Sequence, residues 1–345
     1  MRAWSRLLVV PVVLVLAAAL LAGCGREGSA AGDGGGDTAA EATGLPVTIT
    51  HAFGRTTVAS APERVVTWGW GSADAAIALG VVPVAIPFQD YGGDAQGVLP
   101  WIRQALEQRG ADIPAVLPAG EEPPYEEIAA ARPDLILAPY SGITREQYEL
   151  LSRIAPTVAY PGEPWATPWR DTITITGRAL GRERAARELL DGIDARLREE
   201  AGEHPELAGK TVAMVWDSAG TFYVYRPADP RVQATLALGL RSAPSVQRLA
   251  SGDQSFYYTL STERTDALES DILVSFADTP ALSRAFLRSP HGRAMPQVRR
   301  GAVAEVIGKE FVAAVSPPTA LSLTWGLERY VGLLSDAARR ADAAS

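Results

Sequence analysis

The sequence contains very little cysteine, histidine and lysine. A single cysteine in 345 residues, Cys24, allows no intramolecular disulfide and no zinc site built from thiolates. The three histidines, His51, His204 and His291, lie far apart and lack metal-ligand spacing, so we expect no metal site made of the protein's own side chains. The formal charge is -8 and no basic run occurs, which argues against a nucleic-acid partner.

Common enzyme motifs are also missing. The sequence has no G-x-S-x-G elbow, no P-loop and no convincing Ser/His/Asp set. The acid pairs Asp90 with Asp94 and Glu121 with Glu122 are more typical of solvated loops than of a glycosidase. With 47% hydrophobic and 21% charged residues the chain is globular, and we expect a protein that is not an enzyme.

The first 23 residues have the layout of a secretion signal. Two arginines precede an apolar run over 7–21, and small residues lead to Cys24 in Leu21-Ala22-Gly23-Cys24. The run is shorter than the roughly 20 residues of a membrane-spanning helix and contains Pro11. Because Leu-Ala-Gly-Cys resembles the bacterial lipobox, we expect cleavage after residue 23 and lipidation of Cys24. Cleavage would take the formal charge from -8 to -10.

Residues 24–46 are rich in glycine, alanine, serine, threonine and acidic residues and show no apolar periodicity. Such a stretch buries too little surface to offset its ordering entropy, so it predicts a flexible tether. We expect the tether to separate a folded part, which starts at residue 47, from a membrane surface.

From residue 47 onward, short β-rich runs alternate with helical patterns. We expect strands at 65–68, 82–86, 135–138, 157–159, 211–216, 222–225, 272–276 and 303–306, and helices at 73–79, 101–108, 125–131, 145–154, 232–238 and 319–334. Ser72 is expected to cap the first helix and Gly80 to close it. This alternation predicts an α/β fold with largely parallel sheets.

A long segment without strand signals or proline divides this pattern into two parts. Apolar residues recur at helical spacing between Trp169 and Glu200, and about 30 residues would form a helix of roughly 45 Å. The sequence therefore predicts one rigid linker helix over 166–202, between an N-terminal lobe over 47–165 and a C-terminal lobe over 203–345.

A short motif occurs once on each side of the predicted linker. Glu126 is followed eight residues later by Asp134 and a buried strand, and Glu263 is followed at the same spacing by Asp271 and another strand. The symmetrical placement of the two motifs favours a duplicated lobe.

The order and spacing of these features resemble those of the iron-siderophore substrate-binding proteins of ABC importers, and especially the ferric-enterobactin and hydroxamate-siderophore binders. The resemblance covers about residues 47–338 and rests, besides lipobox, tether and linker, on Pro62-Glu63-Arg64-Val65-Val66, Leu79-Gly80, the segment 126–137, Ala138-Pro139-Tyr140-Ser141-Gly142, Ser261-Thr262-Glu263 and Asp271-Ile272-Leu273. It implies two Rossmann-like α/β lobes joined by one rigid helix, with a ferric siderophore bound in the cleft between them.

Aromatic residues follow successive predicted strands, where α/β sheets open onto a ligand crevice. The expected ligand-binding residues are Trp68, Trp70, Tyr91, Tyr140, Trp216, Tyr225, Arg226, Phe256 and Tyr257. Arg226 would supply positive charge for an anionic chelate, since a guanidinium binds oxygen anions and stacks on rings. The alternative is core packing for each aromatic residue and a solvated turn for Arg226. Core or hinge packing is expected for Trp101, Trp165 and Trp169.

The resemblance gives Glu126 and Glu263 a role in docking. In this family one glutamate on each lobe meets an arginine pocket on a permease subunit, and these two residues occupy the matching places. A glutamate that complements a helix dipole is the alternative. Related hydroxamate binders carry an arginine where this chain has Ala119-Gly120-Glu121-Glu122, so the class of siderophore stays open.

A different cargo on the same fold is the main alternative. Haem or cobalamin would fit the two-lobed architecture, and Tyr91 or Tyr140 would be available as an axial haem ligand. We expect no cofactor and no protein-bound metal, because a siderophore already satisfies its iron. The protein is expected to be a monomer, anchored through Cys24 at the outer face of the cell membrane, with a small closing motion between its lobes.

Overall fold

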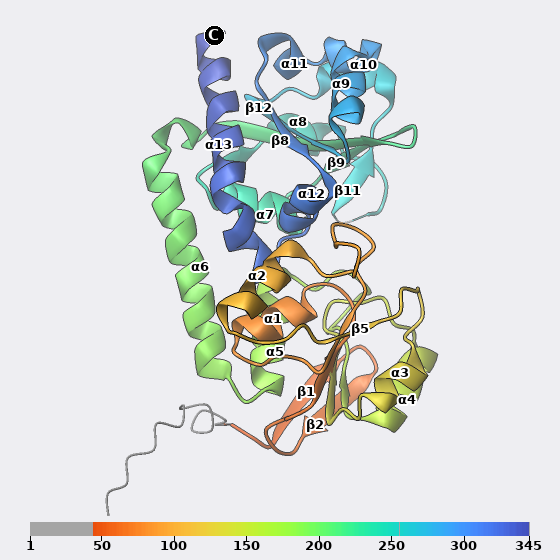
Figure 1. The fold of residues 1–345 in the computed structure, drawn as a ribbon. Helices are drawn as coiled ribbons and strands as arrows, with labels where there is room; N and C mark the ends of the chain where they lie inside the picture. Colours follow the sequence, from red (N-terminus) through yellow and green to blue (C-terminus); the bar gives the residue numbers. More distant parts are fainter. Residues whose placement is uncertain (1–43, 255, 345) are drawn as a thin grey trace, which may run out of the picture. The chain divides into compact units, whose positions relative to one another are not determined.

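The computed structural model describes residues 44–254 and 256–344 (Figure 1). The predicted signal, Cys24 and most of the predicted tether lie outside the described residues. All described residues belong to one unit of the chain. None of the helices within these ranges combines the length and the apolar character needed to cross a membrane.

The N-terminal lobe is built on a five-stranded parallel sheet. Its strands are β3 (Val65–Thr67), β4 (Ala85–Pro87), β5 (Ala115–Leu117), β6 (Leu135–Leu137) and β7 (Thr157–Val158), in the order β5-β4-β3-β6-β7. The helices α1 (Ser72–Ala78), α2 (Pro100–Gln108), α3 (Tyr125–Ala130) and α4 (Arg145–Ile154) connect them. An antiparallel hairpin of β1 (Val47–His51) and β2 (Gly54–Val58) precedes the sheet.

The strand order of this sheet determines where a ligand can bind. The chain passes from β3 outward through β4 to β5 and then returns to the other side of β3 to form β6 and β7. Between β3 and β6 the winding direction therefore reverses, and the loops that follow these two strands diverge. All five strands end at the same edge because they are parallel.

The C-terminal lobe is built on a mixed sheet of six strands. They are β8 (Thr211–Ser218), β9 (Thr221–Tyr225), β10 (Arg241–Ser242), β11 (Tyr257–Thr259), β12 (Ile272–Ala277) and β13 (Val303–Ile307), in the order β11-β9-β8-β12-β13, with β10 beside β8. The strands β9 and β11 are antiparallel to their neighbours. Ala219 and Gly220 both have positive φ, as a tight hairpin turn between β8 and β9 requires.

Helices surround the C-terminal sheet. They are α7 (Pro230–Leu236), α8 (Pro244–Leu249), α9 (Pro280–Arg288), α10 (Pro290–Ala294), α11 (Pro296–Arg300), α12 (Lys309–Val315) and α13 (Ser322–Ala343), with short 3-10 helices η1 (Pro205–Leu207) and η2 (Thr262–Ala267). Proline starts five of these helices, α7 to α11, where its missing N–H costs no hydrogen bond.

The linker is helical, but two helices replace the continuous helix expected over 166–202. These are α5 (Trp169–Ala179) and α6 (Glu183–Glu203), of which α6 runs along one side of the unit in Figure 1. Gly181 has a φ of 67°, a left-handed conformation that ends α5. A Cβ on Gly177 would lie 2.5 Å from the Cβ of Ala186, so glycine permits the two helices to pack closely.

One further expectation differs in detail. The first helix begins at Ser72 rather than after it, and Gly71, with a φ of 71°, is its N-cap residue. The Ser72 hydroxyl donates to the carbonyl oxygen of Trp68 at 3.3 Å instead of capping the helix. Ser72 therefore fixes the loop that follows β3.

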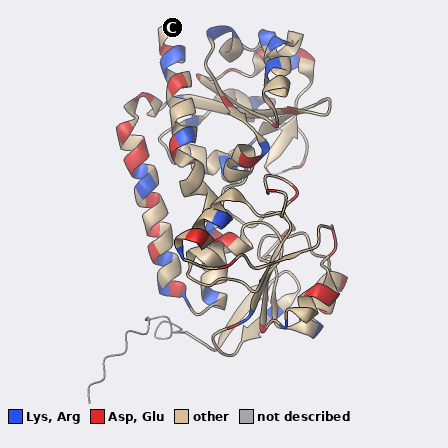
Figure 2. Cartoon of the chain, in the orientation of Figure 1, with Lys and Arg blue, Asp and Glu red and all other residues tan. Residues whose placement is uncertain are grey.

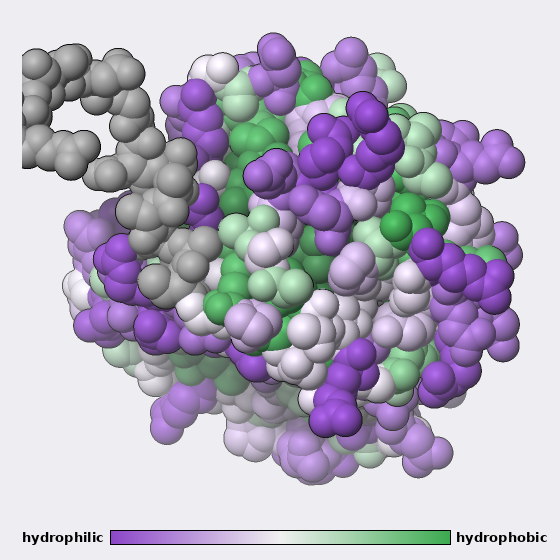
Figure 3. All heavy atoms as spheres, turned by 90° about the horizontal axis from the view of Figure 1, so that it is seen from below, coloured by the Kyte–Doolittle hydropathy of each residue, from purple (hydrophilic) through white to green (hydrophobic). Residues whose placement is uncertain are grey.

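The largest hydrophobic core extends through both lobes. It contains Val65 and Ile77 from the N-terminal lobe and Val274, Phe311 and Leu334 from the C-terminal lobe, all nearly inaccessible to solvent. Outside this core, the lower end of the unit shows hydrophobic residues exposed between hydrophilic ones (Figure 3). A shared core favours a nearly fixed arrangement of the lobes.

Candidate ligand-binding site

A cavity of about 580 Å³ lies at the carboxyl edge of the N-terminal sheet, and the segments that follow all five strands contribute residues to it. Its walls are formed by Trp68, Gly69, Trp70, Pro87, Phe88, Gln89, Gly120, Glu121, Glu122, Gly142, Ile143, Thr144, Gln147 and Trp165. This is the position at which parallel α/β sheets bind ligands, and the volume is typical of small-molecule sites.

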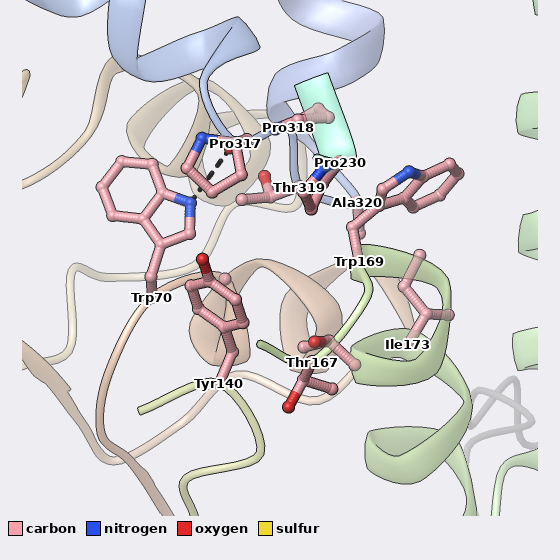
Figure 4. A pocket seen from close by; sticks show the side chains of 12 residues that line it. Trp70, Tyr140, Thr167, Trp169, Ile173, Pro230, Pro317, Pro318, Thr319 and Ala320 are labelled. Carbon is pink, nitrogen blue, oxygen red and sulfur yellow. Dashed lines mark hydrogen bonds between the residues drawn. The ribbon is translucent and has the colours of Figure 1, made fainter. Parts of the chain in front are cut away.

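The loops after β3 and β6 meet at the floor of the cavity. Gly69 has a φ of 87°, and a Cβ at this position would lie 2.3 Å from the carbonyl oxygen of Tyr140. The backbone N–H of Trp70 donates to the same oxygen at 3.0 Å. Glycine at position 69 therefore brings the side chains of Trp70 and Tyr140 together (Figure 4).

Trp165 forms an exposed wall of the cavity, although core or hinge packing was expected for it. Its φ of 57° is unusual for a bulky residue, and its N–H donates to the carbonyl oxygen of Ser141 at 3.0 Å. The indole lies against Gly142 and makes an edge contact with Tyr140 at 5.7 Å between ring centroids. With 51% of its surface exposed, the ring is available to a ligand.

Two polar residues of the cavity are fixed by a helix cap. The Thr144 hydroxyl accepts from the backbone N–H of Gln147, and the Gln147 side chain accepts from the backbone N–H of Thr144. This capping box at the start of α4 gives both side chains one orientation at the cavity wall.

A second, smaller pocket of about 20 Å³ lies between residues of the two lobes and shares Trp70 with the wall of the cavity (Figure 4). Trp70 and Tyr140 line it together with residues of α5 and of the C-terminal lobe, among them Pro230 and Thr319. The indole N–H of Trp70 donates to the carbonyl oxygen of Pro317 at 3.1 Å. Trp70 therefore links the cavity to the C-terminal lobe.

Arg231, on α7, is a cation close enough to Tyr140 to act on it electrostatically, although it lines neither the cavity nor the pocket of Figure 4, and the sequence did not reveal it. Its guanidinium lies 3.9 Å from the ring centroid of Tyr225, and its Nε donates to Oδ1 of Asp229 at 2.8 Å. Burial raises the pKa of the Asp229 carboxyl, while the charge of Arg231 lowers it. Burial raises the pKa of Tyr140 to about 12, with Arg231 opposing this shift and Asp229 adding to it.

The structure places Arg226 away from the cavity. Its Nη2 donates to the carbonyl oxygens of Ser251 and Gly252 at 2.8 and 3.2 Å, and its guanidinium lies 5.6 Å from the ring centroid of Tyr258. Arg226 therefore attaches the end of β9 to a neighbouring loop, and the cation that acts on Tyr140 is Arg231.

Tyr91 crosses between the lobes. Its hydroxyl donates to Oδ1 of Asp278, directly after β12, at 2.6 Å. Burial and the charge of Asp278 raise the pKa of Tyr91, so the hydroxyl stays a proton donor. Trp216 packs between Tyr91 and Phe276, with ring centroids 6.3 and 6.0 Å away.

Phe256 and Tyr257 lie at the outer edge of the C-terminal sheet. Their ring centroids are 5.0 Å apart, and Tyr257 contacts Tyr223 at 5.6 Å across the β9-β11 pair. Neither residue lines the cavity or the smaller pocket beside it. They form an aromatic rim next to Tyr225 rather than a wall of the cavity.

The structure thus brings together only part of the predicted set. Trp68 and Trp70 line the cavity and Tyr140 lines the smaller pocket beside it, whereas Tyr91, Trp216 and Tyr225 belong to the contact region between the lobes. The cavity residues missed are Phe88, Gln89, Gln147 and Trp165, and Arg231, which acts on Tyr140 without lining the cavity, was also missed. Position after a strand, which identified Trp68, would also have identified Phe88 and Gln89.

The two repeated motifs are structurally equivalent. Asp134 precedes β6 and accepts from the backbone N–H groups of Glu63 and Arg64, just before the adjacent strand β3. Asp271 precedes β12 and accepts from the backbone N–H and hydroxyl of Thr211, at the start of the adjacent strand β8. Each aspartate therefore joins the starts of two neighbouring parallel strands.

Glu126 and Glu263 occupy corresponding places before these aspartates. Glu126 lies in the first turn of α3 and Glu263 in η2, and both are exposed. Acidic residues mark α3 in Figure 2. In the ranges that the structure covers, neither glutamate takes part in an ion pair, and no group of three or more His, Cys, Asp or Glu side chains is placed to hold a metal ion.

Comparison with known proteins agrees with this architecture. The family model described as periplasmic binding protein matches residues 65–306. The PiaA protein of Streptococcus pneumoniae in complex with ferrichrome has a TM-score of 0.77 and 35% identity, over 85% of this chain and 99% of that one. A periplasmic solute binding protein from Mycobacterium smegmatis has a TM-score of 0.72 and 30% identity, over 85% and 98%.

Among curated sequences, "Probable siderophore-binding lipoprotein YfiY" of Bacillus subtilis is 29% identical over 182 residues. The match covers 52% of this chain and 52% of that protein. The chain therefore spans about half the length of the first curated relatives that it matches.

Proposed function

Because the chain belongs to the periplasmic binding protein family, we propose that it captures a ferric siderophore outside the cytoplasm and delivers it to an ABC importer for iron uptake. The observation that carries the proposal is the cavity at the carboxyl edge of the N-terminal sheet. Its walls offer the rings of Trp68, Trp70, Phe88 and Trp165. Aromatic faces suit an organic chelate that brings its own iron ligands.

Two groups are suited to contact the oxygen atoms of the chelate. The Tyr140 hydroxyl stays protonated because burial raises its pKa to about 12, so it is a donor. The Arg231 guanidinium opposite it is pre-positioned by the ring of Tyr225 and the carboxylate of Asp229. Together they would orient a siderophore that enters from the cavity of the N-terminal lobe.

Glu126 and Glu263 are proposed to dock the protein on the two permease subunits. The proposal is supported by the equivalent positions of the two glutamates. Each lies eight residues before an aspartate, Asp134 or Asp271, that joins the starts of two neighbouring parallel strands in its lobe. A permease with two related subunits would then meet two related surfaces. Both carboxylates are exposed, so docking needs no rearrangement of the fold.

Cys24 is proposed as the site of lipidation, which would hold the protein at the outer face of the cell membrane. The support is the lipobox sequence and the relative named as a lipoprotein. Mass spectrometry of the protein from membranes should find a chain that starts at Cys24 with a covalent lipid, and a Cys24→Ala variant should be released into the soluble fraction.

Quenching of tryptophan fluorescence tests the binding function. Addition of ferrichrome or another ferric siderophore to the purified protein should give saturable quenching with one site per chain, since Trp68, Trp70 and Trp165 lie at the cavity. Haem added in the same way should give no Soret shift. Saturable haem binding without siderophore binding would refute the proposed cargo.

A further inference from the structure

We propose that the cavity selects ferric chelates without net negative charge, and that Glu121 and Glu122 impose this selection. The inference rests on the proposed function and adds the charge class of the cargo. It differs from the expectation of an anionic chelate held by Arg226, because that guanidinium lies outside the cavity and donates to Ser251 and Gly252.

The charged groups of the cavity wall are all acidic. Glu121 and Glu122 follow β5 and are exposed at the wall, and among the described residues that line the cavity there is no lysine, arginine or histidine. Together with burial, the charge of Glu122 raises the pKa of Tyr125. The other polar side chains of the wall, including Gln89, Thr144 and Gln147, are neutral.

Three charged residues of the C-terminal lobe close to the contact between the lobes, Arg231, Asp229 and Asp278, add no net positive charge. Arg231 is paired with Asp229, whose side chain is only 1% exposed, so the pair contributes no net charge. Asp278 lies at the contact between the lobes and accepts from the neutral hydroxyl of Tyr91. The charged side chains that line the cavity itself therefore contribute a negative field to it.

The charge of a ferric siderophore follows from its iron-binding groups. Three hydroxamates carry three negative charges and neutralise Fe³⁺, whereas three catecholates leave a charge of -3 and citrate complexes also stay anionic. The two carboxylates would repel an anionic chelate and so weaken its binding. The affinity of a neutral chelate would not be lowered by this repulsion. A chelate with a free ammonium group would gain attraction.

A titration with probes of different charge tests the selection. Tryptophan quenching is measured with ferrichrome, which is neutral, ferrioxamine B, which is monocationic, and ferric dicitrate, which is anionic. We expect the wild-type protein to bind the first two at least about tenfold more tightly than ferric dicitrate. In the double variant Glu121→Gln/Glu122→Gln, the ratio between the affinities for the first two chelates and for ferric dicitrate should fall about fivefold. High salt should lower the same affinity ratio in the wild type.

The matched control is Glu127→Gln/Glu149→Gln, which makes the same charge change at exposed residues of α3 and α4 outside the cavity wall. The control variant should show the same affinity ratio between the chelates as the wild type. Equal or tighter binding of ferric dicitrate by the wild type would overturn the inference and leave the proposed function standing. Failure of all three probes to bind would overturn both.

Discussion

The hydroxyl of Thr319 donates a hydrogen bond of 2.5 Å to the buried carboxylate of Asp74. Asp74 lies on α1 of the N-terminal lobe, and Thr319 lies three residues before the first residue of α13 in the C-terminal lobe. The indole N–H of Trp101 donates to the same oxygen at 2.5 Å, and Thr319 is held by two hydrogen bonds with Ser322. A buried polar network therefore joins the lobes beside the ligand site.

The Asp74 carboxyl should make stability depend on pH. Burial raises its pKa to about 6, although hydrogen bonds from Thr319 and Trp101 oppose the shift. The unfolded chain releases this proton near pH 4, so the stabilising contribution is fully present below pH 4 and is lost as the pH rises through 6. The free energy of unfolding of Asp74→Asn minus that of the wild type should rise by about 2 to 3 kcal/mol from pH 4 to pH 7.

Urea unfolding at four pH values in this range measures the difference. Thr319→Val is the companion variant, because it removes a hydrogen bond that favours the ionised carboxylate. Thr319→Val should raise the pH at which the contribution of Asp74 to stability is lost, and it should lower the free energy of unfolding by about 1 to 3 kcal/mol. An Asp74→Asn difference that stays constant with pH would show that Asp74 does not titrate with folding.

Replacement of Trp165 should separate ligand binding from stability. The ring is 51% exposed at the cavity wall, so Trp165→Ala should weaken ferric siderophore binding by about 10- to 50-fold and reduce stability by less than about 1 kcal/mol. Trp325→Ala is the control, since this ring is 36% exposed and does not line the cavity. If both variants changed the affinity equally, Trp165 would not be a ligand-binding residue.

The Arg231 and Asp229 pair allows a double-mutant test. Arg231→Gln leaves the Asp229 carboxylate buried without its partner and should cost about 3 kcal/mol of stability. The double variant Asp229→Asn/Arg231→Gln should recover most of this stability but not the siderophore affinity. If the double variant recovered both stability and siderophore affinity, Arg231 would affect binding only by stabilising the folded protein and not by contacting the ligand.

The docking role of Glu126 and Glu263 is tested by charge reversal. Glu126→Arg/Glu263→Arg should abolish siderophore-dependent iron uptake in cells while the affinity of the purified protein stays within about twofold, because both residues lie outside the cavity. The control Glu127→Arg/Asp266→Arg reverses exposed neighbours on the same two helices and should transport normally. Normal uptake by the first variant would exclude the docking role.

The buried strands were predictable because each is a short run of Val, Ile and Leu. The runs at β3, β6 and β12 are buried throughout and β8 is buried over Val212–Val215, and the positions of all four were predicted to within two residues. The strand β5 was missed because only Leu117 of its three residues is buried. The break between α5 and α6 was missed because one glycine, Gly181, ends a pattern that is otherwise continuous.

The site was predictable where it depends on strand ends and not where it depends on tertiary contacts. Trp68 and Trp70 follow a strand that the sequence shows clearly. Arg231 acts on Tyr140 only because folding brings the two lobes together. Trp165 reaches the cavity through a left-handed backbone conformation that cannot be predicted from the neighbouring residues in the sequence.

The most direct test of the proposed function is a crystal structure of the protein with ferrichrome, with diffraction recorded at the iron absorption edge. We predict one anomalous peak per chain in the cavity lined by Trp68, Trp70 and Trp165, with Tyr140 and Arg231 facing the oxygen atoms of the chelate. The absence of an iron peak under saturating ferrichrome, or a peak outside this cavity, would contradict the account.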